Sequence, residues 1–88
     1  MAVYVDAAKN PYGRMIMCHM LADSLEELHE MADRIGVQRK WFQSKNVPHY
    51  DISKSKRALA VQFGALEIER GKVIELVKKF RTADFLNR

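Results

Sequence analysis

The feature that most constrains the fold is the alternation of strand-like and helix-like segments along the chain. Short apolar runs come before each of three segments that have helical periodicity. The strand-like runs are residues 3–5, 15–21, 41–42, 49–52 and 66–69. The helix-like segments are residues 24–36, 53–63 and 71–82. This alternation predicts an α/β or α+β fold, in which three helices pack on a small mixed or mainly parallel sheet of about four to five strands.

Local signals mark the ends of the predicted helices. Ser24 and Glu27 have the spacing of a capping box, and Gly36 provides a C-terminal stop for the first helix. Ser53 and Gly64 stand in the same places around the second helix. The third helix is predicted from four apolar residues at helical spacing. They are Val73, Leu76, Val77 and Phe80.

Two connecting segments are also expected. Residues 10–13 should form a turn, because Pro11 restricts φ and Gly13 permits positive φ. Residues 44–48 should form a loop, since Pro48 favours extended backbone at the residue before it.

The chain is long enough for one modest hydrophobic core. Its 88 residues are 48% hydrophobic and 30% charged, the balance of a globular protein and not of a disordered one. We therefore expect one domain over residues 1–88, with its C-terminal helix at about residues 71–82. Cys18 is the one cysteine, so a disulfide within the chain and a Cys-based zinc site are both excluded.

Apolar runs in the chain are too short for a membrane span. The longest uncharged apolar run, residues 15–22, is far shorter than the roughly 20 residues that cross a bilayer. The first residues reach Asp6 without the basic segment and long apolar stretch of a signal peptide. We expect no membrane partner and a location in the cytoplasm.

Basic residues are concentrated in the C-terminal half. Residues 46–88 carry nine basic and five acidic side chains, whereas residues 1–45 carry six of each, so the C-terminal half carries the whole net charge of +4. A surplus of this kind favours anionic partners. Lys78, Lys79 and Arg81 need no ligand, because cations near the end of the third helix complement its dipole.

The start of the second helix carries cations where acidic residues are preferred. Lys54, Lys56 and Arg57 lie in the first turn, next to the positive end of the helix dipole. Together with the Ser53 hydroxyl and free backbone N–H groups, they form a candidate site for a phosphate or carboxylate group, and Arg14 is a further candidate. The alternative is a solvated cluster in which Asp51 acts as the cap and the local counter-charge.

Histidine and aspartate side chains form a second candidate set. His49 and Asp51 are the best local pair, because residues two apart on an extended segment point to the same side. A divalent metal ion could be bound if imidazoles and carboxylates converge at strand ends. The candidate metal ligands are Asp6, His19, His49 and Asp51.

Two other interpretations of this set stay open. His49, Asp51 and His19 could act as catalytic acid–base groups without a metal. In the structural alternative, His19 is a hydrogen-bonded core residue, His29 borders the buried face of the first helix, and Asp23 helps to start that helix.

Trp41 and Phe42 follow two cations, Arg39 and Lys40. Aromatic side chains next to cations can stack on nucleic-acid bases. Aromatic residues on a short strand are more often part of the core, and we expect that role here.

Several short motifs together resemble a known family. They are Tyr4 to Asp6, Pro11 with Gly13 and Arg14, His19 to Asp23, Glu27 to His29, Ile35 with Gly36, His49 to Asp51, and Gly64 with Ala65. In this order they resemble the small bacterial and phage family catalogued as domain of unknown function 4031, over about residues 2–70. The family pattern includes polar positions that match Asp6, Arg14, His19, Asp23, Glu27, His29, His49, Asp51 and Arg57.

The resemblance implies a functional site that involves His19, His49, Asp51 and Arg14, but it supplies no activity. It also implies a phage or prophage origin, and hence a location inside a bacterial host cell. Compared with many relatives, this chain has an insertion at residues 44–48, directly before His49.

Three functions follow from these observations. The first is a small module that binds a nucleic acid, a nucleotide or another phosphate-bearing ligand through Arg14, Ser53, Lys54, Lys56 and Arg57. The second is a small hydrolase or nuclease that uses a divalent metal or a His-Asp pair. The third is a non-catalytic phage protein that binds a host protein. The sequence leaves open whether the protein is an enzyme and what its oligomeric state is.

Overall fold

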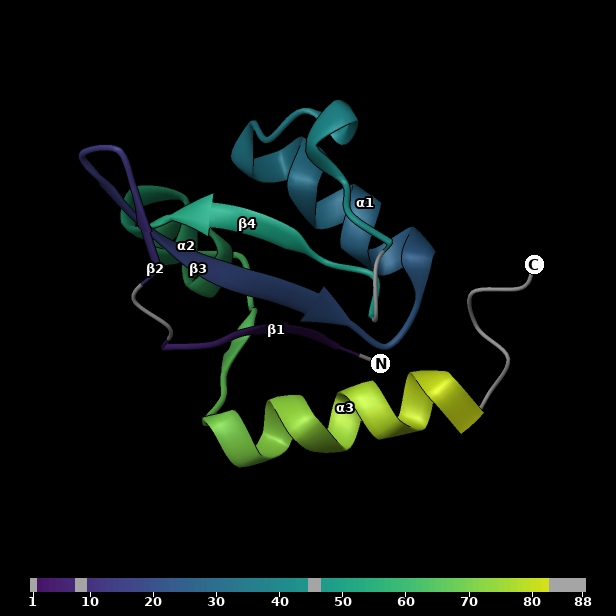
Figure 1. Cartoon of the computed structure of the whole chain (residues 1–88). Helices are drawn as coiled ribbons and strands as arrows, with labels where there is room; N and C mark the ends of the chain where they lie inside the picture. The colour runs from purple at the N-terminus through teal and green to yellow at the C-terminus, as the bar shows by residue number, and fades with distance from the viewer. Residues whose placement is uncertain (1, 8–9, 45–46, 83–88) are drawn as a thin grey trace.

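The computed structural model of the chain describes residues 2–7, 10–44 and 47–82. Strands and helices alternate along these residues, as the sequence predicts (Figure 1). The elements are β1 Val3–Val5, β2 Asn10–Tyr12, β3 Met15–Ala22, α1 Leu25–Ile35, the 3₁₀ helix η1 Arg39–Trp41, β4 Tyr50–Ser53, α2 Lys54–Gln62, β5 Leu66–Glu67 and α3 Arg70–Thr82. In this part of the chain, none of the helices is both long and apolar enough to span a membrane.

β3 is the central strand of the sheet. It pairs antiparallel with β1 and β2 along one edge and with β4 along the other. Met20, for example, faces Val5 of β1 on one side and Tyr50 of β4 on the other. β5 extends the sheet beyond β1 as a parallel strand.

The predicted α/β fold with a mixed sheet and three α-helices is confirmed for the described residues. The alternative of a mainly parallel sheet is wrong, because β1 and β5 are the one parallel pair among the described ladders. One reason is the tight turn between β2 and β3, since two adjacent strands joined by such a turn must be antiparallel.

The segment predicted as a turn is mostly strand. β2 covers residues 10–12 and pairs with Met15 to Met17 of β3, so the reversal is confined to Gly13 and Arg14. Gly13 has φ of 61°, a backbone conformation that glycine adopts without strain. Pro11 is tolerated because β2 lies at the edge of the sheet.

One face of the sheet packs against α1 and α2. Alternate residues of the strands point to this face and join residues of both helices in the main core. The buried strand residues are Val3, Val5, Cys18, Met20, Ala22, Tyr50 and Ile52, and the buried helix residues are Leu28, Met31, Ala32, Ile35 and Ala60. The intervening strand residues, which include His19 and Asp51, therefore point to the opposite face.

The signals at the ends of α1 and α2 operate as predicted. The Ser24 side chain accepts a hydrogen bond from the Glu27 N–H and donates one to the Glu27 carboxylate, and Gly36 ends α1 in the left-handed region with φ of 80°. Ser53 caps α2 by accepting from the Lys56 N–H. The first two helices therefore begin and end where the sequence predicts.

α3 belongs to the opposite face. In Figure 1 it runs below β1, apart from α1, and its residue Leu76 is buried with Leu21 and Val47 in a second small cluster. Tyr4 and Ile68 pack against this cluster. The predicted α3 is confirmed, with Leu76 buried and Val73 half-buried. The side chains of Val77, Phe80, Lys79 and Arg81 lie outside the described ones.

The predicted strand at residues 41–42 is wrong. Residues 39–41 form η1, and Phe42 follows it in extended conformation. Phe42 packs edge-on against His29 and lies near Tyr50 beside the main core, as expected of a core residue. Trp41 does not, because 59% of its surface is exposed. Of the predicted loop at residues 44–48, residues 45–46 lie outside the described ones, and Val47 and Pro48 are buried.

Candidate functional site

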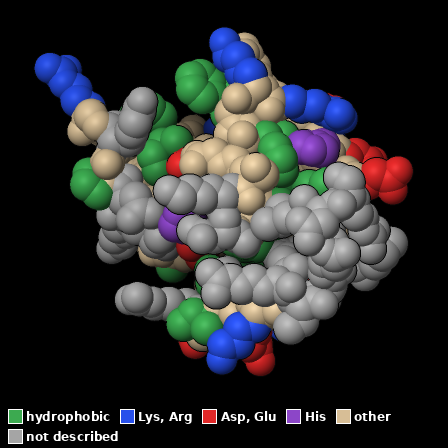
Figure 2. Space-filling model, turned by 45° about the vertical axis from the view of Figure 1, so that its right-hand side comes forward, with side chains coloured by type: hydrophobic (Ala, Val, Ile, Leu, Met, Phe, Trp, Pro, Cys, Tyr) green, Lys and Arg blue, Asp and Glu red, His purple; other side chains and the backbone are tan. Residues whose placement is uncertain are grey.

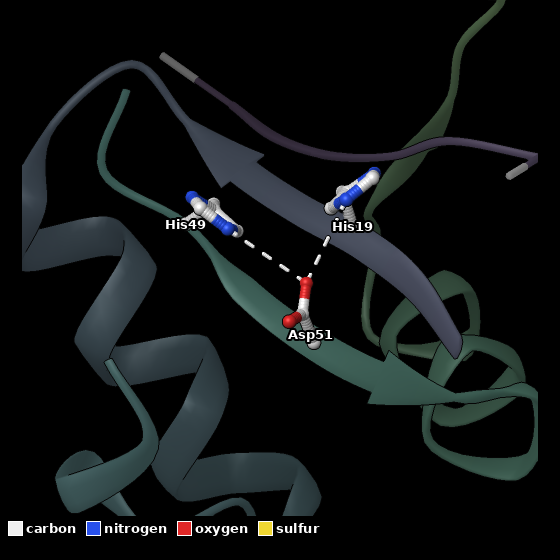
Figure 3. Close-up of side chains that lie close together, drawn as sticks. All are labelled: His19, His49 and Asp51. Atoms are coloured by element: carbon white, nitrogen blue, oxygen red, sulfur yellow. Dashed lines mark ion pairs between the residues drawn. The ribbon is translucent and has the colours of Figure 1, made fainter. Parts of the chain in front are cut away.

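Three side chains meet on the sheet face opposite α1 and α2. His19 of β3 and Asp51 of β4 are directly paired across the two strands. His49 lies two residues before Asp51, so its side chain points to the same face. Figure 3 shows both imidazole rings directed toward the Asp51 carboxylate. We call these residues the His-Asp cluster.

Distances in the His-Asp cluster suit a metal ion. Nε2 of His19 lies 3.6 Å from Oδ1 of Asp51, and Nε2 of His49 lies 3.7 Å from the same oxygen. Ligand atoms from all three residues lie within 4.8 Å of one another. Ligands bound at 2.0–2.2 Å in tetrahedral geometry are roughly 3.3–3.6 Å apart, so small side-chain movements would complete a site.

The opposite nitrogen of each imidazole is already hydrogen-bonded. Nδ1 of His49 lies 2.8 Å from the carbonyl oxygen of Val47, and Nδ1 of His19 lies 2.7 Å from Oδ2 of Asp6. Both partners are acceptors, so each Nδ1 carries a proton and donates it. The neutral form of each ring then has its lone pair on Nε2, which is the nitrogen that faces Asp51.

Gln43 orients the third member of the cluster. Its Nε2 donates a hydrogen bond of 2.7 Å to Oδ2 of Asp51, which leaves Oδ1 directed toward the two histidines. Gln43 is held in place by a backbone bridge to His49, with hydrogen bonds of 2.9 and 3.0 Å. Nothing in the sequence signals this role, because the bridge forms across a loop.

Asp6 supports His19 from the side away from Asp51. It is 5% exposed, and its Oδ1 accepts the backbone N–H of His19 at 2.8 Å while Oδ2 accepts from the ring. This hydrogen bond is the main reason why the pKa of His19 is raised above its usual value, although burial acts against it. The sequence predicts Asp6 as a metal ligand, but in the structure its two carboxylate oxygens bind His19, and it is not among the residues whose ligand atoms converge.

The cluster is open to solvent. The exposed fractions of the His49, His19 and Asp51 side chains are 16%, 33% and 38%. A metal site that serves only structure is usually closed by four protein ligands, whereas a catalytic site keeps a position for water. Three protein ligands at an accessible position match the second kind.

The predicted cationic cluster of α2 is divided in the structure. Arg57 donates from Nε to the carbonyl oxygen of Asp6 at 2.8 Å, and its NH1 lies 2.9 Å from Oε1 of Glu67. These contacts attach α2 to the ends of β1 and β5. Arg57 therefore has a structural role in attaching α2 to the sheet, and its role in a phosphate site stays a prediction.

Lys56 points in another direction. Its Nζ lies 3.2 Å from the position that a β-carbon on Gly36 would take, at the C-terminal end of α1. Cations are stabilised there by the helix dipole. Ser53 is occupied as the cap of α2, while Lys54 and Arg14 are exposed, Arg14 in the turn after β2. Lys56 and Arg57 thus contact different parts of the fold, and the phosphate-binding role of the five residues stays a prediction.

His29, Asp23 and Cys18 lie outside the His-Asp cluster and have structural roles. Nδ1 of His29 lies 2.6 Å from the hydroxyl of the buried Tyr50, and burial lowers the pKa of His29. The Asp23 carboxylate accepts hydrogen bonds from the Tyr4 hydroxyl and the Ala2 N–H, which fastens the start of β1. Cys18 is buried, and burial raises the pKa of its thiol, as expected for a core residue.

A groove adjoins the His-Asp cluster at Asp51 and Gln43. It has a volume of about 490 Å³ and runs past η1 and the C-terminal end of α1. Its lining residues are Met15, Met17, Gly36, Val37, Gln38, Trp41, Gln43, Asp51, Ile52, Ser53 and Lys56. We call it the Trp41 groove.

Comparison with known proteins gives one match. A family model described as "Protein of unknown function (DUF4031)" matches residues 3–80, which confirms the resemblance found in the sequence and extends it through most of α3. No curated protein and no solved structure matches the chain.

Proposed function

The chain belongs to the protein family of unknown function DUF4031, whose description assigns no activity, and from the geometry of its own residues we propose that it is a small metal-dependent hydrolase. In this proposal, His19, His49 and Asp51 hold one divalent transition-metal ion. The observation that carries the proposal is the convergence of two imidazole Nε2 atoms and one carboxylate oxygen within 4.8 Å.

The ligand atoms restrict which metal ions the cluster can bind. Two imidazoles and one carboxylate suit Zn²⁺, Fe²⁺ or another first-row transition ion. Mg²⁺ and Ca²⁺ prefer oxygen ligands alone, which this cluster does not provide. A bound ion of this kind lowers the pKa of a coordinated water to about 7 and so supplies hydroxide near neutral pH.

The surrounding residues support this role. Asp6 and the Val47 carbonyl hold the two rings with Nε2 directed inward, and acceptors of this kind raise the basicity of a histidine ligand. Gln43 holds Asp51 so that one carboxylate oxygen faces the rings. The three ligands are therefore already ordered in the folded protein, so little side-chain entropy would be lost when a metal binds.

Metal titration of the chelator-treated protein tests the proposal. We expect one Zn²⁺ or Co²⁺ per chain by isothermal titration calorimetry, and loss of that binding in His49→Ala and Asp51→Asn. His29→Asn and Asp33→Asn are matched controls, because they remove an imidazole and a carboxylate that lie outside the His-Asp cluster. Absence of stoichiometric binding in the wild-type protein would overturn the proposal.

Activity is tested separately with chromogenic phosphate esters, one monoester and one diester, and with a chromogenic carboxylic ester. We expect hydrolysis that requires the added metal and is lost in His49→Ala but kept in His29→Asn. Metal binding without hydrolysis of either substrate class would leave a metal-binding protein and refute the hydrolase.

A further inference from the structure

The Trp41 groove has the size and position of a substrate site. Pockets that bind small molecules have volumes of roughly 300–1,000 Å³, and this groove is within that range at about 490 Å³. Asp51 lines the groove and also belongs to the His-Asp cluster. The groove therefore borders the proposed metal site.

Trp41 offers a stacking surface in this groove. The indole is 59% exposed, and the Lys40 ammonium lies 5.3 Å from the centre of its ring. Met15 and Met17, from the β3 end of the groove, add apolar and polarisable surface. An exposed tryptophan beside methionines in a groove favours a flat, aromatic ligand group over a flexible polar one.

Lys56 and Ser53 give the same groove a polar side. Lys56 is the one cation among the described residues that line it, and its Nζ lies close to Gly36, which also lines the groove. Ser53 faces Met17 across the strands, next to the pair of His19 and Asp51. The cation at this place favours an anionic group on the ligand.

The single cation in the lining of the Trp41 groove favours a small ligand over a duplex nucleic acid. On the face shown in Figure 2, the described Lys and Arg side chains lie in separate groups around the rim and form no continuous basic surface. Binding to a duplex depends on neutralising many phosphates along one surface. A single cation in a groove instead matches a ligand that has one phosphate group.

We propose that the Trp41 groove binds a nucleotide, with the base stacked on Trp41 and the phosphate near Lys56 and Ser53. The inference rests on the proposed hydrolase, because it names the substrate of that site as a phosphate ester. A metal held by the His-Asp cluster would activate a water, whose oxygen would bond to phosphorus while the ester P–O bond breaks. The proton lost by the water passes to the departing ribose oxygen, which leaves as a hydroxyl.

Fluorescence gives a direct test, because Trp41 is the single tryptophan of the chain. We expect AMP to change the Trp41 emission saturably in the presence of a metal chelator, so that this binding is measured without the metal. Adenosine and inorganic phosphate should each bind more weakly than AMP. If AMP gives no saturable change at millimolar concentration, the inference is refuted.

Two neighbouring lysines provide the matched variants. Lys56→Gln should weaken AMP binding about tenfold, since it removes one charge-assisted hydrogen bond. Lys54→Gln removes the same charge from the same helical turn but lies outside the lining of the groove, so its AMP affinity should equal that of the wild type. Equal loss in both variants, or none in either, would show that the phosphate does not bind at Lys56.

The two proposals fail in different ways. His49→Ala should lose metal binding and keep the AMP-dependent change in emission, because His49 belongs to the His-Asp cluster but is not among the residues that line the groove. If the protein binds AMP but no metal, the hydrolase is wrong and the nucleotide site stands. If it binds metal but AMP and adenosine bind equally, the nucleotide inference is wrong and the metal site stands.

Discussion

Replacing Asp6 with Asn tests how the fold prepares His19 for metal binding. The Asp6 carboxylate accepts two hydrogen bonds from the same residue, one from the His19 backbone N–H at 2.8 Å and one from its ring Nδ1 at 2.7 Å. An Asn side chain has the same shape but only one acceptor oxygen, and its NH₂ group is a donor. One of the two donors of His19 must therefore lose its acceptor.

Either orientation of the Asn side chain would impair metal binding or stability. In the first arrangement, the Asn oxygen still accepts from the His19 backbone N–H, and the Asn NH₂ group faces Nδ1 of the ring. Nδ1 must then act as an acceptor, so the ring proton moves to Nε2. Nε2 is the nitrogen that faces Asp51, so the metal would meet a proton in place of a lone pair. If the oxygen keeps the ring, a backbone N–H is left without an acceptor beside a nearly buried side chain.

These contacts set the expected loss of metal affinity and of stability. Loss of a group that orients a metal-binding histidine typically reduces affinity 10- to 100-fold, which is about 1.4–2.7 kcal/mol. An unpaired buried donor costs about 1–3 kcal/mol of stability. We therefore expect Asp6→Asn to weaken Zn²⁺ binding by at least about tenfold and also to lower the free energy of unfolding.

Competition with a chromogenic chelator measures the Zn²⁺ Kd, and urea unfolding of the metal-free protein measures stability. Asp33→Asn is the control, because Asp33 is an exposed carboxylate that pairs with Arg39. An Asp6→Asn variant that folds and binds Zn²⁺ with an unchanged Kd would refute the role of Asp6. It would also weaken the case that the His19 tautomer is set in advance.

Two further predictions concern stability. Gly36→Ala should lower the free energy of unfolding by about 1–2 kcal/mol, because residue 36 has φ of 80°. Gly71→Ala lies in α3 with open space around it, so its effect should be neutral or slightly stabilising. Urea unfolding measures both variants. The half-buried His29 has a lowered pKa, so below about pH 6.5 the unfolded chain binds a proton that the folded protein resists. The stability advantage of the wild type over His29→Gln should therefore shrink as the pH falls from about 7 to 5, and an advantage that is constant with pH would contradict this account.

Local parts of the fold could be predicted because their causes are local. The capping box at Ser24, the left-handed Gly36 and the apolar spacing that buries Leu76 involve residues a few positions apart. η1 was mistaken for a strand, since the aromatic pair at residues 41–42 has strand propensity but its packing is decided by the neighbouring core. Phe42 reaches that core, and Trp41 does not.

The candidate site also has a part that depends on local sequence and a part that depends on long-range contacts. The sequence by itself determined that His49 and Asp51 share one side of a strand, because side chains alternate along extended backbone. Only the tertiary structure decided that His19 joins them, since the register of β3 against β4 pairs residues 32 positions apart. It also decided that Asp6 orients His19 and that Arg57 binds Glu67, as each contact depends on where the sheet brings distant segments together.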